Sequence, residues 1–483
     1  MYVFDPRIVR PYDIRGIYHE SNVGVIDEKV VYALAQAYVR VFPPEQSPAA
    51  QKAVVLGRDV RDTSAALHQA ALDGLTEAGV DVVDIGVIST DMLYFTVAAY
   101  DYAGGIILSA SHNPKEFAGL KLVREKAIPI SEDSGLRDIG LEAWRRGRVL
   151  ASQKGKVESR DIVDDYVRKV RSFLGGIEIR PFKVVLNANC GLAGKVGEQV
   201  LEGLPVTIVE RLYWEPDGSF PVPDGRPDPL WRPNRRQMEE AVKRHGGEAL
   251  GVAWDADADR CFFFTEKGEF VPPYFMTVLL SRYLLRHAPA DSTRIVIHDP
   301  RLVWAVQDKV REAGGTPLVN KCGHAFFKEA MRKHDALFAG EASAHYYFRD
   351  FYYCDNGLVP FLLMLALLSE EDKTLTEMVA PLRAQYAVAD EINLVVENHW
   401  GKIEEVQDYF LRQRQHDARL DEFDGVDGLS VTSVEERAWR FNLRPSNTES
   451  LLRLNVESTS GPKMVQRVVG ELLELIQPQE IVQ

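Results

Sequence analysis

Short apolar segments alternate with amphipathic segments along most of this chain, and this order limits the possible folds more than any other feature. The pattern predicts strands at residues 53–56, 82–85, 106–108, 119–123, 182–186 and 206–209. Between the first two, Leu67, Ala71 and Leu75 recur at the spacing of one helix face. Repeated strand–helix order predicts α/β domains whose strands are mostly parallel.

The alternation restarts along the chain, which indicates more than one domain. A charged, glycine-containing stretch at residues 145–160 is the first predicted linker, and a new unit is expected from the strand at Leu250. After Tyr386 the pattern changes, with strands at 391–396 and 439–443 and helices at 403–416 and 463–476. A chain of 483 residues has room for roughly three or four domains.

Composition excludes several classes of function. The net charge of −14 argues against nonspecific binding to nucleic acid. The four cysteines show no C-x-x-C spacing, so we expect free thiols in a reducing cytoplasm. The longest apolar run, residues 358–368, contains Pro360 and is too short to span a bilayer, so it predicts a buried helix. The N-terminal residues show no signal-peptide pattern. We therefore expect a cytoplasmic protein that binds neither nucleic acid nor a membrane.

The stretch at residues 106–114 combines a strand with reactive side chains. Ser111 lies just beyond the predicted strand end, where α/β sheets usually place their reactive groups. His112 and Asn113 offer hydrogen bonds, and Pro114 fixes the following turn. An ordinary Ser/Asn/Pro loop is the alternative. Lys121, on the next strand, is a candidate for proton transfer or phosphate binding, although a lone strand lysine usually faces solvent.

Three carboxylates alternate along residues 255–259, directly after an apolar strand. Asp255, Asp257 and Asp259 would repel one another on one strand face, so they predict a loop that wraps a hard cation. Magnesium fits, because it favours a few carboxylates together with substrate phosphate oxygens. Arg260 at loop position 6, where a calcium-binding EF-hand needs glycine, and the strand-like setting of Glu266 at position 12 argue against that motif. A solvated acidic loop is the alternative.

Further predicted strands, at residues 295–298, 318–319 and 336–339, end in basic or hydroxyl-binding side chains. These are Arg301, His324, Glu341, Ser343 and His345. Glu341 and Ser343 suit sugar hydroxyls, and His345 suits proton transfer near neutral pH. Any single histidine is more often structural, but several such strand ends favour a shared cleft.

Two further segments offer groups that bind phosphate. Arg444, Ser446, Asn447 and Thr448 lie in one tight loop, and Arg453 follows on the next strand. This combination of a guanidinium with hydroxyl and amide donors predicts a phosphate cradle. A hairpin loop with capping side chains is the alternative. Near the start of the chain, Arg15 carries a weaker signal of the same kind.

These motifs resemble, in content and order, those of the α-D-phosphohexomutase family, and most closely those of its bacterial phosphomannomutases. The residues that carry the resemblance are 12–16, 109–114, 255–260, 323–324, 341–345 and 444–448. The resemblance implies three related α/β domains with mixed or parallel sheets and a C-terminal α+β domain, arranged around a central cleft. We expect the four domains at residues 1–155, 156–249, 250–384 and 385–483.

The resemblance also implies roles for the candidate residues. Ser111 would be a phosphoserine that holds Mg²⁺ together with Asp255, Asp257 and Asp259. Lys121 or His345 would transfer the proton, and Arg15 and His112 complete the implied catalytic set. The implied substrate contacts are Tyr12, Arg301, His324, Glu341, Ser343, Arg444, Ser446, Asn447, Thr448 and Arg453.

Four positions depart from the family pattern. Ala256 and Ala344 stand at common glycine positions, and Ser450 replaces a frequent proline. Arg301 stands where many members have lysine. No departure removes a ligand, but arginine and lysine bind differently, so the role of Arg301 stays open.

The implied reaction interconverts a hexose 6-phosphate and a hexose 1-phosphate through the phosphoserine and a bound hexose 1,6-bisphosphate, which also acts as activator. Mannose is the expected sugar, with glucose and glucosamine phosphates as alternatives, because no residue visibly reads the position at C2. A serine phosphatase and a non-catalytic sugar-phosphate-binding protein are the rival classes. The expected partners are small hexose phosphates, and the chain is expected to be a monomer or a homodimer.

Overall fold

The computed structural model describes residues 5–19, 24–145, 148–416, 420–433, 437–446 and 451–482. The chain divides into two compact units, which are described separately. The first unit comprises Met1–Val271, His324–Lys333 and Ala344–Asp372. The second comprises Pro272–Gly323, His334–Ser343 and Lys373–Gln483.

The first sheet of the first unit has seven strands in the order β2-β1-β6-β5-β3-β4-β7. Its strands are β1 (Ile14–Tyr18), β2 (Val25–Ile26), β3 (Gln51–Arg58), β4 (Val82–Val87), β5 (Tyr102–Leu108), β6 (Phe117–Arg124) and β7 (Val157–Ser159). Its helices are α1 (Glu28–Val41), α2 (Ser64–Glu77), α3 (Thr90–Ala99) and α4 (Leu136–Arg145). Strands β3, β4, β5 and β7 run parallel, and β6 runs antiparallel to β5.

Strand β5 is buried along its whole length because helices cover both faces of the sheet. Successive residues of a strand face opposite sides of the sheet, and two neighbouring glycines of β5 show which helix covers each face. A Cβ at Gly104 would collide with Tyr38 of α1, whereas one at Gly105 would collide with Val97 of α3. The predicted alternation of strands and helices is therefore confirmed for this sheet.

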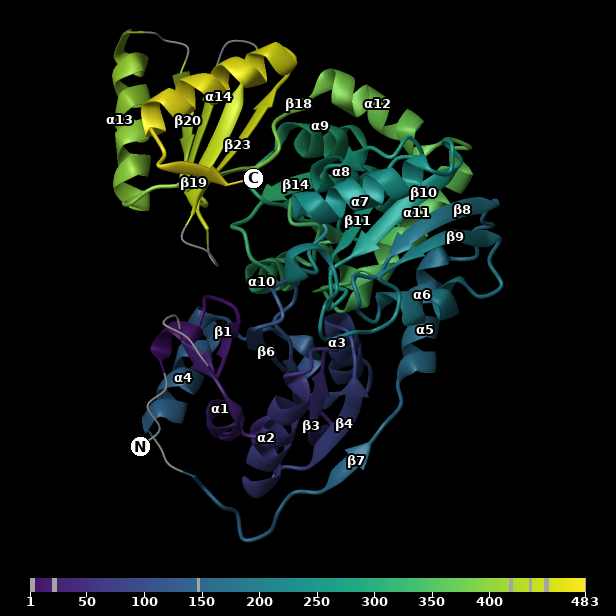
Figure 1. Ribbon diagram of the computed structural model, residues 1–483, viewed down its shortest axis with the longest axis vertical. Helices are drawn as coiled ribbons and strands as arrows, with labels where there is room; N and C mark the ends of the chain where they lie inside the picture. Colours follow the sequence, from purple (N-terminus) through teal and green to yellow (C-terminus); the bar gives the residue numbers. More distant parts are fainter. Residues whose placement is uncertain are drawn as a thin grey trace. The chain divides into compact units, whose positions relative to one another are not determined.

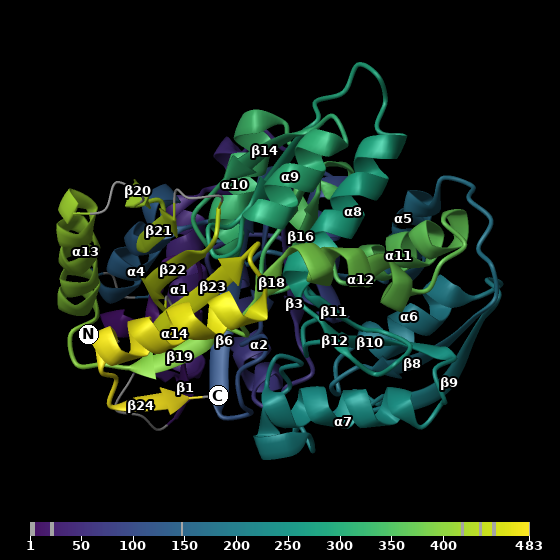
Figure 2. The same cartoon turned by 90° about the horizontal axis from the view of Figure 1, so that it is seen from above.

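The second sheet of the first unit has five strands in the order β12-β11-β10-β8-β9. Its strands are β8 (Phe182–Asn187), β9 (Val206–Leu212), β10 (Ala249–Trp254), β11 (Cys261–Phe264) and β12 (Phe270–Val271). The helices beside it are α5 (Val163–Arg171), α6 (Ala193–Leu201), α7 (Arg232–Lys243) and α11 (Leu358–Glu370). Helix α7 lies on one face, and α6 and α11 lie on the other (Figure 2). The first unit also contains β16 (Tyr346–Phe348), β17 (Cys354–Asp355) and most of α10 (His324–His334).

Strand β10, which leads into the acidic loop, pairs in parallel with β8. The sequence pattern placed the start of a third domain at this strand, but the pairing puts it in the same sheet as residues 182–212. We therefore propose a domain boundary after Val271, the last residue of β12, instead of the expected one before Leu250.

The second unit contains two groups of elements. In the first group, β13 (Ile295–His298), β14 (Thr316–Val319) and β15 (Phe338–Gly340) are parallel. The helices of this group are α8 (Pro273–His287), α9 (Trp304–Glu312) and α12 (Leu375–Gln385). Among the described residues of the chain, no helix combines the length and the apolar composition needed to cross a membrane.

The second group of this unit is an antiparallel sheet with two helices (Figure 1). Its strands are β18 (Ala387–Val388), β19 (Ile392–Val395), β20 (Leu420–Asp424), β21 (Leu429–Ser433), β22 (Arg440–Pro445), β23 (Leu452–Ser458) and β24 (Glu480–Val482). Helices α13 (His399–His416) and α14 (Pro462–Ile476) share one apolar core with the sheet, through Phe410 and Leu472 for example. This agrees with the expected change of pattern after Tyr386.

Trp254 links the end of β10 to α11 and provides a test of this packing. Its indole Nε1 donates to the carbonyl of Gly357 at 2.8 Å, and its ring meets Phe361 edge-on at 5.6 Å. Trp254→Phe removes the hydrogen bond to that buried carbonyl and reduces the ring volume. We expect the free energy of unfolding to fall by about 1–3 kcal/mol, measured by urea and thermal unfolding.

The matched control is Trp400→Phe, because the Trp400 side chain on α13 is 62% exposed. This change should alter stability by less than about 0.5 kcal/mol. Equal effects of the two substitutions would contradict the importance of the Trp254 contact.

Candidate functional site

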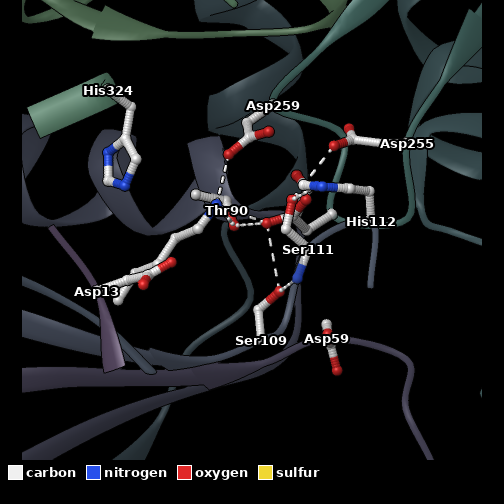
Figure 3. Close-up of polar contacts among 12 residues, drawn as sticks. Asp13, Asp59, Thr90, Ser109, Ser111, His112, Asp255, Asp259 and His324 are labelled. Atoms are coloured by element: carbon white, nitrogen blue, oxygen red, sulfur yellow. Dashed lines mark hydrogen bonds and ion pairs between the residues drawn. The ribbon is translucent and has the colours of Figure 1, made fainter. Parts of the chain in front are cut away.

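Ser111 lies in the loop after β5 and is almost completely buried. Its φ of 51° lies in the left-handed region, which a non-glycine residue adopts only under strain. Its Oγ is 3.3 Å from Asp255 Oδ2 and 3.3 Å from His112 Nδ1 (Figure 3). The structure thus brings together the serine and the acidic loop that the sequence singled out separately.

Arg61 holds this loop through hydrogen bonds from its guanidinium, and no sequence motif predicted this role. Its guanidinium donates to the carbonyl oxygens of Ser111 and Asn113, both at 2.6 Å, and of Pro114 at 2.7 Å. Asp59 accepts a hydrogen bond from Arg61 Nε at 3.1 Å, and its carboxylate offsets the positive charge of the guanidinium. Arg61 is 1% exposed, so these bonds are shielded from water. The sequence feature that could have predicted this role is the position of Arg61 just after β3, because the end of β3 adjoins the end of β5 in the sheet.

The three aspartates of the acidic loop are buried, and their oxygens lie within 4.8 Å of one another. Burial and the charges of the neighbouring aspartates raise the pKa of Asp255 well above its usual value. Lys121, from β6, reaches Asp257 Oδ2 at 2.7 Å and Asp259 Oδ2 at 2.5 Å. Burial alone would raise the pKa of Asp259, but the charges of Lys121, His345 and Arg260 together outweigh burial and hold that pKa well below the usual value.

The donor set of this loop fits a hard divalent cation. All three side chains offer carboxylate oxygens, and Asp257 Oδ1 is buried and has no hydrogen-bond partner within the part of the chain that the structure describes. Magnesium binds such oxygens readily and keeps positions for substrate oxygens. Thr90, at the start of α3, supports the loop by donating from its hydroxyl to Asp257 Oδ2 at 2.6 Å. Thr90 follows β4 at another strand end, a signal that the sequence analysis left unused.

Both histidines expected near this centre lie in the first unit. His345 Nε2 is 3.3 Å from Asp259 Oδ1 and 3.3 Å from Arg260 Nε. The His324 ring meets Tyr12 edge-on, with centroids 4.9 Å apart, and lies 6.3 Å from the His345 ring. Burial and nearby positive charges lower the pKa of His324 well below its usual value, so it is neutral at pH 7.

Arg15 belongs to the same region. Its guanidinium donates to Asn113 Oδ1 at 2.6 Å and to Asp13 Oδ2 at 2.5 Å. Burial, together with the charges of Arg260 and Arg15, lowers the pKa of His112 well below its usual value. The side chains expected from the first unit therefore gather in one buried, polar centre around Ser111.

Ala344 shows why the family pattern favours glycine at its position. Its φ of 68° lies in the left-handed region, where a glycine is unstrained. Its carbonyl accepts a hydrogen bond from the amide of Cys261 at 3.2 Å, which joins this loop to the start of β11. The strained turn places His345 beside Arg260.

The remaining candidates belong to the second unit. Arg301 donates to Asp299 Oδ2 at 2.6 Å, and its guanidinium lies 4.0 Å from Glu341 Oε1. Glu341 accepts a hydrogen bond from the amide of Gly323 at 3.0 Å. Ser343 follows in the same loop and is half-buried. Asp299, which orients Arg301, was not predicted as a site residue.

A second group of arginines surrounds Glu391, another residue that the sequence analysis missed. Arg453 lies 3.4 Å and Arg301 lies 3.6 Å from its carboxylate oxygens. Burial alone would raise the pKa of Glu391, but these guanidiniums and that of Arg444 outweigh it and lower the pKa to about 2. Arg444 is buried, and its Nε has no hydrogen-bond partner among the described residues.

Part of the expected phosphate cradle cannot be placed. Ser446 is half-buried, and its amide donates to the carbonyl of Leu451 at 2.8 Å. Asn447 and Thr448 lie outside the described residues. The cradle and the central cleft therefore stay predictions.

Comparisons with known proteins agree with this arrangement. Residues 6–139, 164–268 and 272–386 match the alpha/beta/alpha domains I, II and III of phosphoglucomutase/phosphomannomutase, and residues 391–475 match its C-terminal domain. The chain is similar to a phosphomannomutase of Escherichia coli K12, with 40% identity over 474 residues that cover 97% of this chain and 98% of the relative. It is also similar to one of Vibrio cholerae serotype O1, with 39% identity over 478 residues and 98% of both chains covered.

A solved structure shows the same architecture. An X-ray structure of a phosphoglucomutase/phosphomannomutase family protein from Burkholderia thailandensis matches with a TM-score of 0.80 at 26% identity. The match covers 99% of this chain and 100% of that chain. The expected fold class, with three α/β domains and a C-terminal α+β domain, is confirmed.

The acidic loop should bind Mg²⁺ with an affinity that depends on Asp257. Even residues that only support metal ligands typically contribute about 10–100-fold to affinity, so Asp257→Asn should weaken binding at least tenfold. Isothermal titration of the full chain with MgCl₂ measures this. The control is Asp138→Asn, because Asp138 is exposed on α4. Unchanged affinity in Asp257→Asn would rule out this loop as the metal site.

Proposed function

Since this chain belongs to the phosphoglucomutase/phosphomannomutase family and is an isomerase, we propose that it interconverts mannose 6-phosphate and mannose 1-phosphate through a phosphorylated Ser111. One observation carries the proposal. Ser111 Oγ lies 3.3 Å from Asp255 Oδ2, at the edge of a buried cluster of carboxylates that fits Mg²⁺. Phosphoryl transfer needs a positioned acceptor and nearby positive charge; Ser111 Oγ would be the acceptor, and Mg²⁺ held by the carboxylates would supply the charge.

The reaction consists of two transfers in opposite directions. In the first, a hydroxyl oxygen of the sugar phosphate attacks the phosphorus on Ser111. The new oxygen–phosphorus bond forms as the bond to Ser111 Oγ breaks, and the hydroxyl proton passes to a base. The resulting hexose 1,6-bisphosphate reorients and returns its other phosphoryl group to Ser111 Oγ. The same bisphosphate, supplied as activator, would phosphorylate an unmodified Ser111.

We assign the base to His345 and not to Lys121. Burial would lower the pKa of Lys121, but the carboxylates of Asp257 and Asp259 outweigh it and raise that pKa, so the amine stays protonated. A protonated lysine cannot accept the hydroxyl proton, although it contributes positive charge to the centre. His345 lies beside Asp259 Oδ1, which can stabilise its imidazolium after proton transfer.

The residues of the acidic loop would hold the metal. Bound Mg²⁺ would offset negative charge on the transferring phosphoryl oxygens. The second-unit residues would bind the rest of the substrate, with Glu341 and Ser343 on sugar hydroxyls. Arg444, Arg453 and Ser446, together with Asn447 and Thr448, would bind its existing phosphate. Tyr12, Arg15, Arg301 and His324 would complete the substrate contacts.

The sugar is assigned from the relatives, which are named phosphomannomutases. Mannose and glucose differ only at C2, so glucose and glucosamine phosphates are the alternatives. Comparing kcat/KM on mannose 1-phosphate, glucose 1-phosphate and glucosamine 1-phosphate separates them, and a clear preference for either alternative would reject mannose. Cytoplasmic location and a monomeric or homodimeric state stay predictions.

Ser111→Ala should abolish turnover, because it removes the oxygen that carries the phosphoryl group. Intact-mass measurement after incubation with a hexose 1,6-bisphosphate should show one phosphoryl adduct on the wild-type chain and none on the variant. Ser152→Ala, at an exposed serine, should keep both adduct and activity. Full activity in Ser111→Ala would end the proposal of a covalent carrier.

Arg444→Ala tests whether one phosphate cradle serves both transfers. Losing a charge-assisted contact costs roughly 1.5–3 kcal/mol, which corresponds to about a ten- to a hundredfold drop in kcat/KM. We expect similar drops from mannose 1-phosphate and from mannose 6-phosphate, because the substrate reorients between the transfers. Initial rates in both directions, with saturating bisphosphate, measure this.

The control for this substitution is Arg467→Ala, since the Arg467 side chain on α14 is 57% exposed. It should change neither rate. A large loss in one direction, with the other direction unaffected, would show two separate phosphate sites.

A further inference from the structure

Lys328 is a fully buried lysine next to a histidine that the proposed mechanism uses. It lies four residues after His324 on α10, so both side chains share one face of the helix. Lys328 Nζ is 3.3 Å from His324 Nδ1 and 2.9 Å from Asp355 Oδ1. The lysine is 0% exposed.

Aromatic rings complete the surroundings of this ammonium. Lys328 Nζ lies 3.9 Å from the ring centroid of Tyr94 on α3 and 6.0 Å from that of Tyr347 on β16. Such ring faces attract a cation. Asp355 and the two rings therefore hold the ammonium in one place, where it also faces His324 Nδ1.

The chemistry of this pair decides the tautomer of His324. An ammonium can only donate hydrogen bonds, so the ring nitrogen that faces it must carry a lone pair. A neutral imidazole with a bare Nδ1 carries its proton on Nε2. Burial, followed by the charges of Lys328, Lys121 and His345, lowers the pKa of His324, which agrees with a neutral ring.

The opposite side of the ring has an unused donor. His324 Nε2 is buried and has no hydrogen-bond partner among the described residues. Figure 3 draws no interaction between His324 and the other residues shown around Ser111. A buried N–H without an acceptor is unfavourable, so this nitrogen is suited to an oxygen of a bound ligand.

We propose that Lys328, anchored by Asp355, is a positioning residue that holds His324 as its Nε2–H tautomer, ready to donate to an oxygen of the sugar phosphate. The donation from His324 to an oxygen of the sugar phosphate rests on the proposed function. The tautomer itself does not, because it follows from the contacts of Lys328. A lysine that only anchored α10 would stabilise the helix without selecting a tautomer.

The experiment measures the tautomer directly by NMR. The full chain is labelled with ¹⁵N-histidine in the presence of Mg²⁺, and long-range ¹H–¹⁵N spectra at neutral pH distinguish a protonated ring nitrogen from a bare one. Loss of one signal set in His324→Gln assigns His324. The test variant is the double substitution Lys328→Met with Asp355→Asn, which removes both charges and so leaves neither buried and unpaired. Lys333→Met, at an exposed lysine of α10, is the matched control.

The wild-type chain and Lys333→Met should show a protonated Nε2 and a bare Nδ1 at His324. In the double variant this pattern should be lost, and kcat/KM should fall about tenfold, as for the loss of one oriented donor. Three results would overturn the proposal: a proton on Nδ1 in the wild type, an unchanged tautomer in the double variant, or a changed tautomer with unchanged kcat/KM. If none of the proteins turns over a hexose phosphate, the proposed function fails while the NMR result still tests the role of Lys328.

Discussion

Three like charges buried within 4.8 Å of one another would repel strongly, and their compensation is the constraint on which the first unit depends. Lys121 supplies it by reaching both Asp257 and Asp259. The lysine belongs to β6 of the first sheet, whereas the aspartates follow β10 of the second sheet. Removing one partner of a buried pair of this kind typically costs about 3–5 kcal/mol, because the other charge is left buried and uncompensated, so the lysine of one sheet and the aspartates of the other depend on each other.

The same contacts place the reactive side chains. Thr90, Ser109 and Lys121 all approach Asp257 Oδ2, and they come from the start of α3, the loop after β5 and strand β6. The strained backbone at Ser111 is held by Arg61, whose guanidinium binds three carbonyl oxygens of this loop, at residues 111, 113 and 114. Strain of this kind persists only where the surroundings determine the conformation fully. A rigid serine loop facing a charged cluster follows from this packing.

Sequence reasoning succeeded where the signal is local. Ser111, Lys121 and the three aspartates were each found from a strand end or a neighbouring strand, and they meet in one centre. It failed for Arg61, Lys328 and Glu391, because each of them has partners that lie far away along the chain. Lys328, for example, is one of several charged residues on an amphipathic helix, and nothing in its neighbourhood marks it as buried. The pairing of β10 with β8, on which the proposed boundary after Val271 rests, was not predicted, because strand pairing is a long-range contact.

The order of strands and helices, the buried character of β5 and α11, and the oxygen-rich chemistry of the acidic loop follow from the sequence alone. These are properties of residue type and spacing, which act over a few neighbours. Only the tertiary structure decided which carboxylates share Lys121, which carbonyls bind Arg61 and which nitrogen of His324 faces an ammonium. The first two facts depend on contacts between segments that are remote in sequence, and the third depends on how two side chains of one helix are turned. All three involve distances of about 3 Å, and at that scale the direction of one side chain changes the chemistry.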